Sequence, residues 1–295
     1  MSRIIRVGSR DSVLAIKQAE IVIEAAKAAN QVMEFEIVRV KTTGDKILEK
    51  RLDTIGGKGL FIKELEQALV NGDIDMAVHS YKDIPYEGTS GLPIVALSKR
   101  ETPFDALVLP KGAAEIDRSK PVGSSSQRRI IQFHKLYDGF DLKSVRGNVL
   151  TRLSKLDSGE YSALILAQAG LIRLSLQSRI HRVFTADEMI PSGSQGILAV
   201  QGRQGEDYSY LNRFHNRESE IVSKAERQYL KTLDGGCASP VAVYGRVHSN
   251  ELMLTGMYVD ASGNVETGKI SGDAGKAESL GDALAKRLKA RSENR

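Results

Sequence analysis

The sequence has one cysteine and no apolar run that approaches the roughly 18 residues of a membrane-spanning helix. A single cysteine excludes an internal disulfide, and the five histidines are too scattered to offer a cluster of metal ligands. Residues 1–8 lack a signal-peptide pattern. These absences argue against a disulfide-rich secreted protein and against a membrane protein. They predict a cytoplasmic chain without a metal.

Aromatic residues are also few, at 5% of the 295 residues, although the net charge is +5 and the isoelectric point about 9.1. A basic chain is compatible with nucleic-acid binding, but here the arginines lie beside glycine and serine rather than among aromatic residues. That pattern suits pockets for small anions better than a platform on which bases stack. The length allows two or three domains, and the 41% hydrophobic content is that of a globular protein.

Strands and helices alternate along the first third of the chain. Residues 4–7 form a predicted strand, and a helix follows that Asp11 or Ser12 can cap. Small apolar residues repeat at helical spacing from Ala15 to Ala29, so this helix buries one face. Further strands are predicted at 35–40, at Ile94–Leu97 and at 104–109. The alternation indicates an α/β domain.

Residues 75–85 combine a short apolar run with a polar end. The run at 76–78 predicts a buried strand, and Pro85 ends the polar segment after it. Ser80, Lys82 and Asp83 then lie at the carboxyl end of a strand, where open α/β sheets bind ligands. The alternative for this stretch is an ordinary solvated turn.

A similar pattern, a strand followed by a polar turn and a helix, occurs three times in the middle of the chain. Strands ending at Val122, Val145 and in Ala163–Ala167 each lead into a polar turn and a helix that carries arginine. Helix N-termini offer free N–H groups, and arginine adds bidentate donors for anions. The pattern therefore predicts a ligand with several carboxylates or phosphates, the alternative being three unrelated helix caps.

Two glycine-rich stretches and the cysteine complete the candidate elements. Residues 46–59 end in Gly-Gly-Lys-Gly, which is typical of a mobile lid, an anion-binding turn or a plain helix start. Residues 190–196 are rich in glycine, serine and proline, which interrupt helices and strands, and are predicted to connect two domains. A strand at 197–201 is predicted to return to the first domain, so that two strands join the lobes as a hinge. Cys237 comes after two glycines, so it is either a small buried residue or an exposed nucleophile or covalent anchor.

Five motifs together resemble one family. They are Leu233-Asp-Gly-Gly-Cys237, His79-Ser-Tyr-Lys-Asp-Ile-Pro85, Gly57-Lys-Gly-Leu-Phe61, residues 123–129 and Arg146-Gly-Asn-Val-Leu-Thr-Arg152. In their order along the chain they resemble the porphobilinogen deaminase (hydroxymethylbilane synthase) family over residues 7 to about 243. The set of five is highly specific, and the residues beyond 243 fit in length and pattern.

The resemblance implies an α/β fold with two periplasmic-binding-protein-like lobes joined by a two-strand hinge. A small C-terminal α+β domain comes next, with a three-stranded antiparallel sheet and helices. The implied domains are 1–97 with 196–215, then 98–195, then 216–295, the last carrying the cysteine.

The resemblance also implies the chemistry. The family attaches a dipyrromethane cofactor to the cysteine at position 237 through a thioether. It then condenses four porphobilinogen molecules head to tail with loss of ammonia, and water releases the linear tetrapyrrole hydroxymethylbilane. The implied protein is a transferase that acts as a monomer, without nucleic acid or membrane, and passes its product to a downstream uroporphyrinogen-forming enzyme.

Transferred residue by residue, the family's motifs assign a catalytic role to Asp83. The implied cofactor-binding residues are Cys237, Lys82, Asp83, Ser126, Arg128, Arg129, Arg146 and Arg152. The implied substrate-binding residues are Arg10, Ser12, Gln18, Lys58, Arg146, Arg152, Arg173 and Gln195.

The sequence departs from the family pattern at two places. Thr54 replaces a lysine that many relatives carry. Residues 194–197 read Ser-Gln-Gly-Ile, whereas the family more usually has Gly before the Gln and Ala after the Gly.

The alternative to the enzyme is a non-catalytic bilobed protein that binds a polycarboxylate, because fold does not fix function. Nucleic-acid binding rests on the isoelectric point alone and predicts steeply salt-dependent binding to duplexes.

Overall fold

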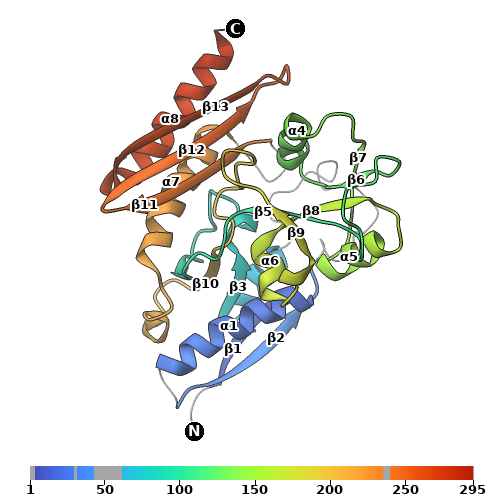
Figure 1. The fold of residues 1–295 in the computed structure, drawn as a ribbon. Helices are drawn as coiled ribbons and strands as arrows, with labels where there is room; N and C mark the ends of the chain where they lie inside the picture. The colour runs from blue at the N-terminus through green and yellow to red at the C-terminus, as the bar shows by residue number, and fades with distance from the viewer. Residues whose placement is uncertain (1–3, 30–31, 43–61, 235–239, 295) are drawn as a thin grey trace. The chain divides into compact units, whose positions relative to one another are not determined.

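The computed structural model describes residues 4–29, 32–42, 62–234 and 240–294. By contact, the chain divides into two units, Met1–Glu101 with Ile197–Glu220 and Thr102–Gly196 with Ile221–Arg295. Three sheets are described, two mixed sheets of five strands and one antiparallel sheet of three. Figure 1 labels the elements along the chain.

The first sheet has the strand order β2-β1-β3-β10-β4. Its strands are β1 (Ile4–Arg10), β2 (Glu34–Val40), β3 (Met76–Ser80), β4 (Ile94–Leu97) and β10 (Leu198–Gly202). β1 pairs in parallel with both β2 and β3, whereas β10 is antiparallel to β3 and β4. The carboxyl ends of β1 and β3 therefore meet at one edge. The predicted return of residues 197–201 to the first domain is confirmed, because β10 lies between β3 and β4 in this sheet.

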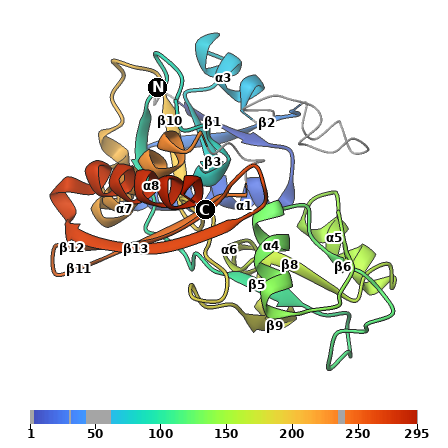
Figure 2. The same ribbon diagram turned by 90° about the horizontal axis from the view of Figure 1, so that it is seen from above.

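Two helices cover the two faces of this sheet (Figure 2), α1 (Val13–Ala29) and α3 (Lys63–Val70). The buried face of α1, with Ala19 and Val22, packs on Val7 and Val78 of the strands. Leu65 and its neighbours in α3 pack on the other face. Ser12 precedes α1, and its hydroxyl accepts a hydrogen bond from the backbone N–H of Ala15 at 3.3 Å. Of the two predicted caps, Ser12 is thus the one that caps the helix.

The second sheet repeats this topology with the order β7-β6-β8-β5-β9. Its strands are β5 (Asp105–Val108), β6 (Val122–Gly123), β7 (Leu142–Lys143), β8 (Ala163–Ala167) and β9 (Ile180–Val183). β6 is parallel to β7 and β8, and β5 is antiparallel to β8 and β9. Position by position, β6 matches β1, β8 matches β3 and β5 matches β10.

One matched pair of hydrogen bonds supports the repeat. After β3, the N–H of Tyr81 donates to the carbonyl of Ile197 at 2.9 Å, and after β8 the N–H of Gln168 donates to that of Phe104 at 3.0 Å. Each bond joins the residue after a parallel strand to the residue before its antiparallel neighbour. The two lobes are therefore built on one plan, as the α/β fold class predicts.

Three helices flank the second sheet, α4 (Gln127–Leu136), α5 (Val149–Asp157) and α6 (Gln168–Arg173). Phe133 of α4 packs on one face with Ile165, while Leu156 of α5 and Leu171 of α6 pack on the other. The helices therefore start at the carboxyl ends of β6, β7 and β8, where the sequence places its arginines.

The C-terminal sheet is the antiparallel β11-β12-β13. It is formed by β11 (Ala242–His248), β12 (Glu251–Val259) and β13 (Val265–Asp273), with α7 (Arg217–Thr232) before it and α8 (Ala277–Glu293) after it. Figure 2 shows α8 running along the sheet. The other face carries Ala242 and Met257, which pack on Ile190 at the end of the second lobe. This arrangement confirms the predicted domain of three strands and two helices.

Candidate functional site

In the first lobe, Lys82 and Asp83 are held on a short, well-anchored turn. β3 is buried along its length and runs into the 3₁₀ turn η1 (Tyr81–Asp83). Tyr81 is buried, and its backbone N–H donates to the carbonyl of Ile197, the residue before β10. Lys82 and Asp83 are only half-buried. No described residue forms a hydrogen bond or an ion pair with the Asp83 carboxylate. A rigid backbone thus presents a carboxylate whose oxygens are available to a ligand.

Other predicted residues lie at the same edge of the first sheet. Arg10 is the last residue of β1, and Ser12 is the cap of α1. Gln18 of α1 is 4% exposed, and its side-chain amide donates to the Ser80 hydroxyl at 3.1 Å. This bond ties α1 to the end of β3, immediately before the Asp83 turn. The structure therefore brings together five of the residues assigned to a ligand: Arg10, Ser12, Gln18, Lys82 and Asp83.

His79 adds an ionisable group to this edge that the sequence analysis did not assign. It is buried in β3, and its Nε2 has no hydrogen-bond partner among the described residues. Burial is the main reason that the pKa of His79 is lowered to about 4; a hydrogen bond with the Gln201 side chain opposes this effect, and the charge of Arg10 adds a smaller lowering. At neutral pH the imidazole is therefore uncharged, so the nearby charges are those of Arg10, Lys82 and Asp83.

In the second lobe, the arginines at the start of α4 meet a buried acid. Arg128 and Arg129 form ion pairs with Asp105, the first residue of β5, at 2.8 and 2.7 Å. Gln195 donates its side-chain amide to the same carboxylate at 2.9 Å and to the carbonyl of Pro103 at 2.6 Å. Asp105 and Gln195 are at most 1% exposed. Three residues assigned to ligand binding thus share one carboxylate.

The charge of this cluster follows from its geometry. Burial tends to raise the pKa of Asp105, but the guanidiniums of Arg128 and Arg129 outweigh it and hold that pKa well below its usual range. Burial lowers the pKa of Arg128, and Asp105 opposes this effect. With the acid ionised and both arginines charged, the cluster carries one net positive charge.

Three further arginines of the second lobe lie before α5, within α5 and at the end of α6. Arg146 follows β7, just before the cap of α5, where the side chain of Asn148 accepts from the N–H of Thr151 at 2.9 Å. Arg152 of α5 donates from Nε to the carbonyl of Gly147 at 2.8 Å. Arg173 ends α6 and donates from Nη2 to the carbonyl of Gly196 at 2.6 Å. All three residues are half-buried.

Several predicted features lie outside the described residues. These are Cys237, Lys58, Thr54 and the glycine-rich stretch 46–59. The described chain ends at Asp234 before the cysteine and resumes at Pro240. In the part of the chain that is described, no three His, Cys, Asp or Glu residues are grouped as metal ligands. Within the same residues, no helix has the length and apolar character to cross a bilayer.

Asp105 is the residue that the sequence analysis missed. Residues 104–109 were predicted as a strand, and the acid at its start was not assigned a role. A single carboxylate within an otherwise apolar strand was the available signal, because a charge there is costly unless it is paired. The arginines that pair with it were already candidates.

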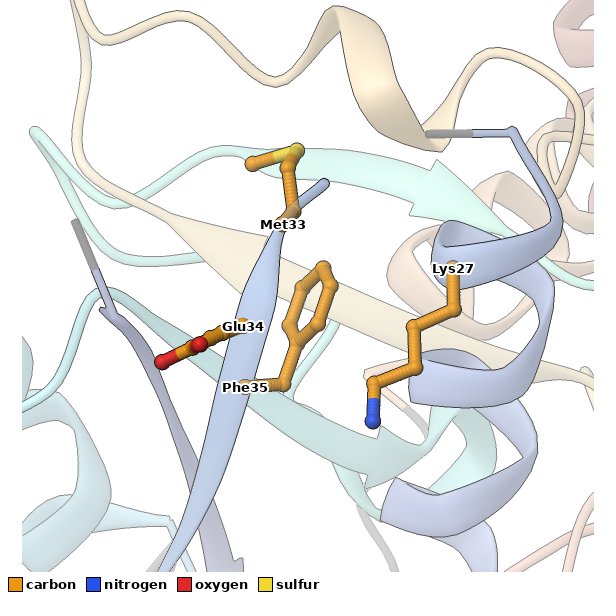
Figure 3. Close-up of a pocket in the computed structure, with 4 residues that line it drawn as sticks. All are labelled: Lys27, Met33, Glu34 and Phe35. Carbon is orange, nitrogen blue, oxygen red and sulfur yellow. The ribbon is translucent and has the colours of Figure 1, made fainter. Parts of the chain in front are cut away.

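One hollow on the first lobe is separate from this edge. It has a volume of about 470 Å³ and is lined by Lys27, Met33, Glu34 and Phe35. Figure 3 shows the Phe35 ring and the Lys27 side chain on one side of β2 and Glu34 on the other. Glu34 pairs with Ile4 at the start of β1, whereas Arg10 is at the end of that strand. The hollow therefore lies at the amino ends of the strands, away from the candidate residues.

Comparison with known families identifies the chain. Residues 5–210 match the model of the porphobilinogen deaminase dipyromethane cofactor binding domain, and residues 221–290 match that of the porphobilinogen deaminase C-terminal domain. The chain belongs to the porphobilinogen deaminase family. Members of this family are transferases of tetrapyrrole biosynthesis that act on porphobilinogen, and the larger domain is the one that binds their dipyrromethane cofactor.

Curated relatives match almost the whole chain. The porphobilinogen deaminase of Acetivibrio thermocellus is 55% identical over 281 residues, which is 95% of this chain and 96% of the relative. That of Alkaliphilus oremlandii is 53% identical over 289 residues and 98% of each chain. Among solved structures, a putative periplasmic sulfonate-binding protein from Methylobacillus flagellatus matches 79% of this chain and 68% of that one, at 16% identity and a TM-score of 0.39.

The described residues of the second lobe fit an anionic group such as dipyrromethane. Arg128 donates only from Nη1 to the protein, so its Nε and Nη2 remain without a hydrogen-bond partner among the described residues. The hydroxyl of Ser126, at the start of α4, makes no cap bond. Unused donors beside a helix N-terminus are what the acetate and propionate groups of a pyrrole chain require.

Proposed function

We propose that Asp83 is the catalytic carboxylate with which this chain condenses porphobilinogen units and releases hydroxymethylbilane. The observation that carries this proposal is the Asp83 carboxylate itself, half-buried on a fixed turn and without a described partner. Loss of ammonia from porphobilinogen leaves an electron-poor methylene pyrrole, and positive charge develops on the pyrrole nitrogen. A carboxylate held in place stabilises this charge and accepts the proton that the new carbon–carbon bond displaces.

The arginines of the second lobe are proposed to hold the growing chain by its carboxylates. Dipyrromethane, when bound, supplies the pyrrole carbon on which the chain is extended. The residues proposed to hold it are Cys237, Lys82, Ser126, Arg128, Arg129, Arg146 and Arg152. Arg10, Ser12, Gln18, Lys58, Arg173 and Gln195 are proposed to act on the incoming substrate together with Arg146 and Arg152. Each added pyrrole brings two carboxylates, so several cations are needed along the path.

A non-catalytic receptor for a polycarboxylate is not favoured, because the family to which the chain belongs is a family of transferases. The finer predictions stay predictions: the domain boundaries 1–97 with 196–215, 98–195 and 216–295, the cytoplasmic location and the monomeric state. The same holds for the transfer of the product to a downstream uroporphyrinogen-forming enzyme and for the absence of nucleic-acid binding.

Replacement of Asp83 tests the proposal. We expect Asp83→Asn to lower turnover of porphobilinogen about 100-fold or more, because the amide neither carries the charge nor accepts the proton. The melting temperature should stay within about a degree of wild type, since the carboxylate makes no described contact that folding would lose. Asp73→Asn, at an exposed acid of the same lobe, is the matched control. Turnover of Asp83→Asn near that of the control would remove Asp83 from the reaction.

A further inference from the structure

Gln168 is a polar residue at the carboxyl end of β8 that none of the five motifs contains. It comes directly after β8, the strand that matches β3 of the first lobe. The turn after β3 carries Lys82 and Asp83, whereas Ala169 and Gly170 follow Gln168 and are buried. Because ligands of open α/β sheets lie at the carboxyl ends of strands, Gln168 is the polar side chain that β8 offers to a ligand.

The Thr102 hydroxyl fixes the direction of the Gln168 side-chain amide. It donates to Oε1 of Gln168 at 2.7 Å, and both residues are half-buried. The backbone N–H of Gln168 donates to the carbonyl of Phe104 at 3.0 Å, so the residue is anchored at two points. Since Oε1 accepts from Thr102, the Nε2 atom points to the other side of the amide. Within the described residues, Nε2 donates to no acceptor.

The surroundings of Gln168 favour a negatively charged acceptor for these two N–H groups. Phe104, to which its backbone is bonded, is followed by Asp105. Asp105 forms ion pairs with Arg128 and Arg129, and the cluster keeps one net positive charge because two guanidiniums face one carboxylate. A hydrogen bond to an ionised acceptor is stronger than one to a neutral group. The neutral amide can therefore add a donor for a carboxylate that these cations attract.

We propose that Gln168 is a ligand-binding residue whose Nε2 donates to a carboxylate of the pyrrole chain, and that Thr102 is the positioning residue that orients its amide. This inference rests on the proposed function, which supplies the carboxylates. The alternative is a structural role, in which Gln168 only accepts from Thr102 and so ties the end of β8 to the segment before β5.

Two substitutions of Gln168 separate these roles in the full-length holoenzyme. Gln168→Glu keeps an oxygen for the Thr102 hydroxyl but replaces the N–H groups with a negative charge, whereas Gln168→Leu removes both functions. We expect the half-saturating concentration of porphobilinogen to rise about tenfold in Gln168→Leu and about 30-fold in Gln168→Glu, because the glutamate also repels the carboxylate. At a fixed porphobilinogen concentration, the mass of the intact chain should show fewer pyrroles on Gln168→Glu than on wild type. Melting temperatures should stay within about two degrees of wild type.

Thr102→Val tests the orientation of the amide, because valine has the shape of threonine without the hydroxyl. The half-saturating concentration should rise about threefold, and Thr102→Ser, which keeps the hydroxyl, should restore the wild-type value. Gln177→Glu, the same change at an exposed glutamine of the same lobe, is the matched control for charge.

A purely structural role predicts the opposite order, with Gln168→Glu close to wild type and Gln168→Leu less stable. Half-saturation of Gln168→Glu at the same porphobilinogen concentration as Gln177→Glu would overturn the inference alone. A Gln168→Glu chain that acquires no cofactor, beside a loaded Gln177→Glu, would support it, since the cofactor has the same carboxylates. A wild-type chain that condenses no porphobilinogen would instead overturn the proposed function.

Discussion

His79 shows how burial sets the chemistry of a single residue. The imidazole lies in β3, next to the turn that carries Asp83, and burial lowers its pKa to about 4. In the unfolded chain the pKa of a histidine is near 6.5. Between about pH 4 and pH 6.5 the unfolded chain therefore binds a proton here that the folded chain does not. Stability contributed by neutral His79 is present above pH 6.5 and is lost as the pH falls through this window.

We expect this histidine to account for up to about 3 kcal/mol of the difference in unfolding free energy between pH 7 and pH 4. His79→Gln should flatten the dependence of the urea midpoint on pH between pH 4.5 and 6.5, because the glutamine binds no proton. His134→Gln, at an exposed histidine, is the control and should keep the wild-type slope. Equal slopes in wild type and His79→Gln would show that His79 titrates normally in the folded chain.

Single residues also show which parts of the site were predictable from the sequence. The positions of Asp83 and Ser12 were predictable because a polar residue after a buried strand, or before a helix, has few structural options. Asp105 was not found, because its meaning depends on Arg128, Arg129 and Gln195, which only tertiary structure brings to it.

At the scale of elements, α7 fastens the C-terminal domain to the segment that leaves the second lobe. Glu226 of α7 is fully buried, and its two carboxylate oxygens accept from the backbone N–H groups of Ser194 and Gly245, each at 2.6 Å. Ser194 has a φ of 61°, a left-handed conformation that is uncommon for a non-glycine residue. Glu226 therefore holds this turn in place, and Gln195 is the next residue along the chain.

We expect Glu226→Gln to lower the melting temperature by about 5 °C or more. An amide accepts on one side only, so one of the two buried N–H groups would face an NH₂ group and lose its bond. Glu218→Gln, at an exposed acid of the same helix, is the matched control and should melt with wild type. Differential scanning calorimetry of both variants checks this, and unchanged melting of Glu226→Gln would mean that the turn holds without the carboxylate.

Elements were predicted best where their sequence pattern was long. The buried face of α1, the strands Ile94–Leu97 and Ala163–Ala167 and the three-stranded C-terminal sheet agree with the structure. The strands β6 and β7 were predicted only by their ends, at Val122 and Val145, and β7 ends earlier, at Lys143, because two residues are too few to show a period. Which strands pair was beyond the sequence pattern, with the return of β10 to the first sheet as the exception.

At the scale of the whole molecule, the two lobes share one sheet topology but carry different charges at matching positions. The first lobe places a carboxylate without a described partner at the end of β3, and the second places arginines at the matching edge of its own sheet. The fold alone does not explain these differences, because both sheets have the same strand order. The proposed roles of these residues account for the differences, because the ligand of this family carries many carboxylates and reacts through a centre that becomes positive.

The attachment of dipyrromethane to Cys237 is the central claim about the whole molecule. The decisive measurement is the mass of the intact, active protein beside that of Cys237→Ser. We expect active wild-type protein to be heavier than its polypeptide by two linked pyrroles, and peptide mapping to place the added mass on residues 235–239. The serine variant should have the mass of the bare chain and no activity. Active wild-type protein with the mass of the bare chain would contradict the claim.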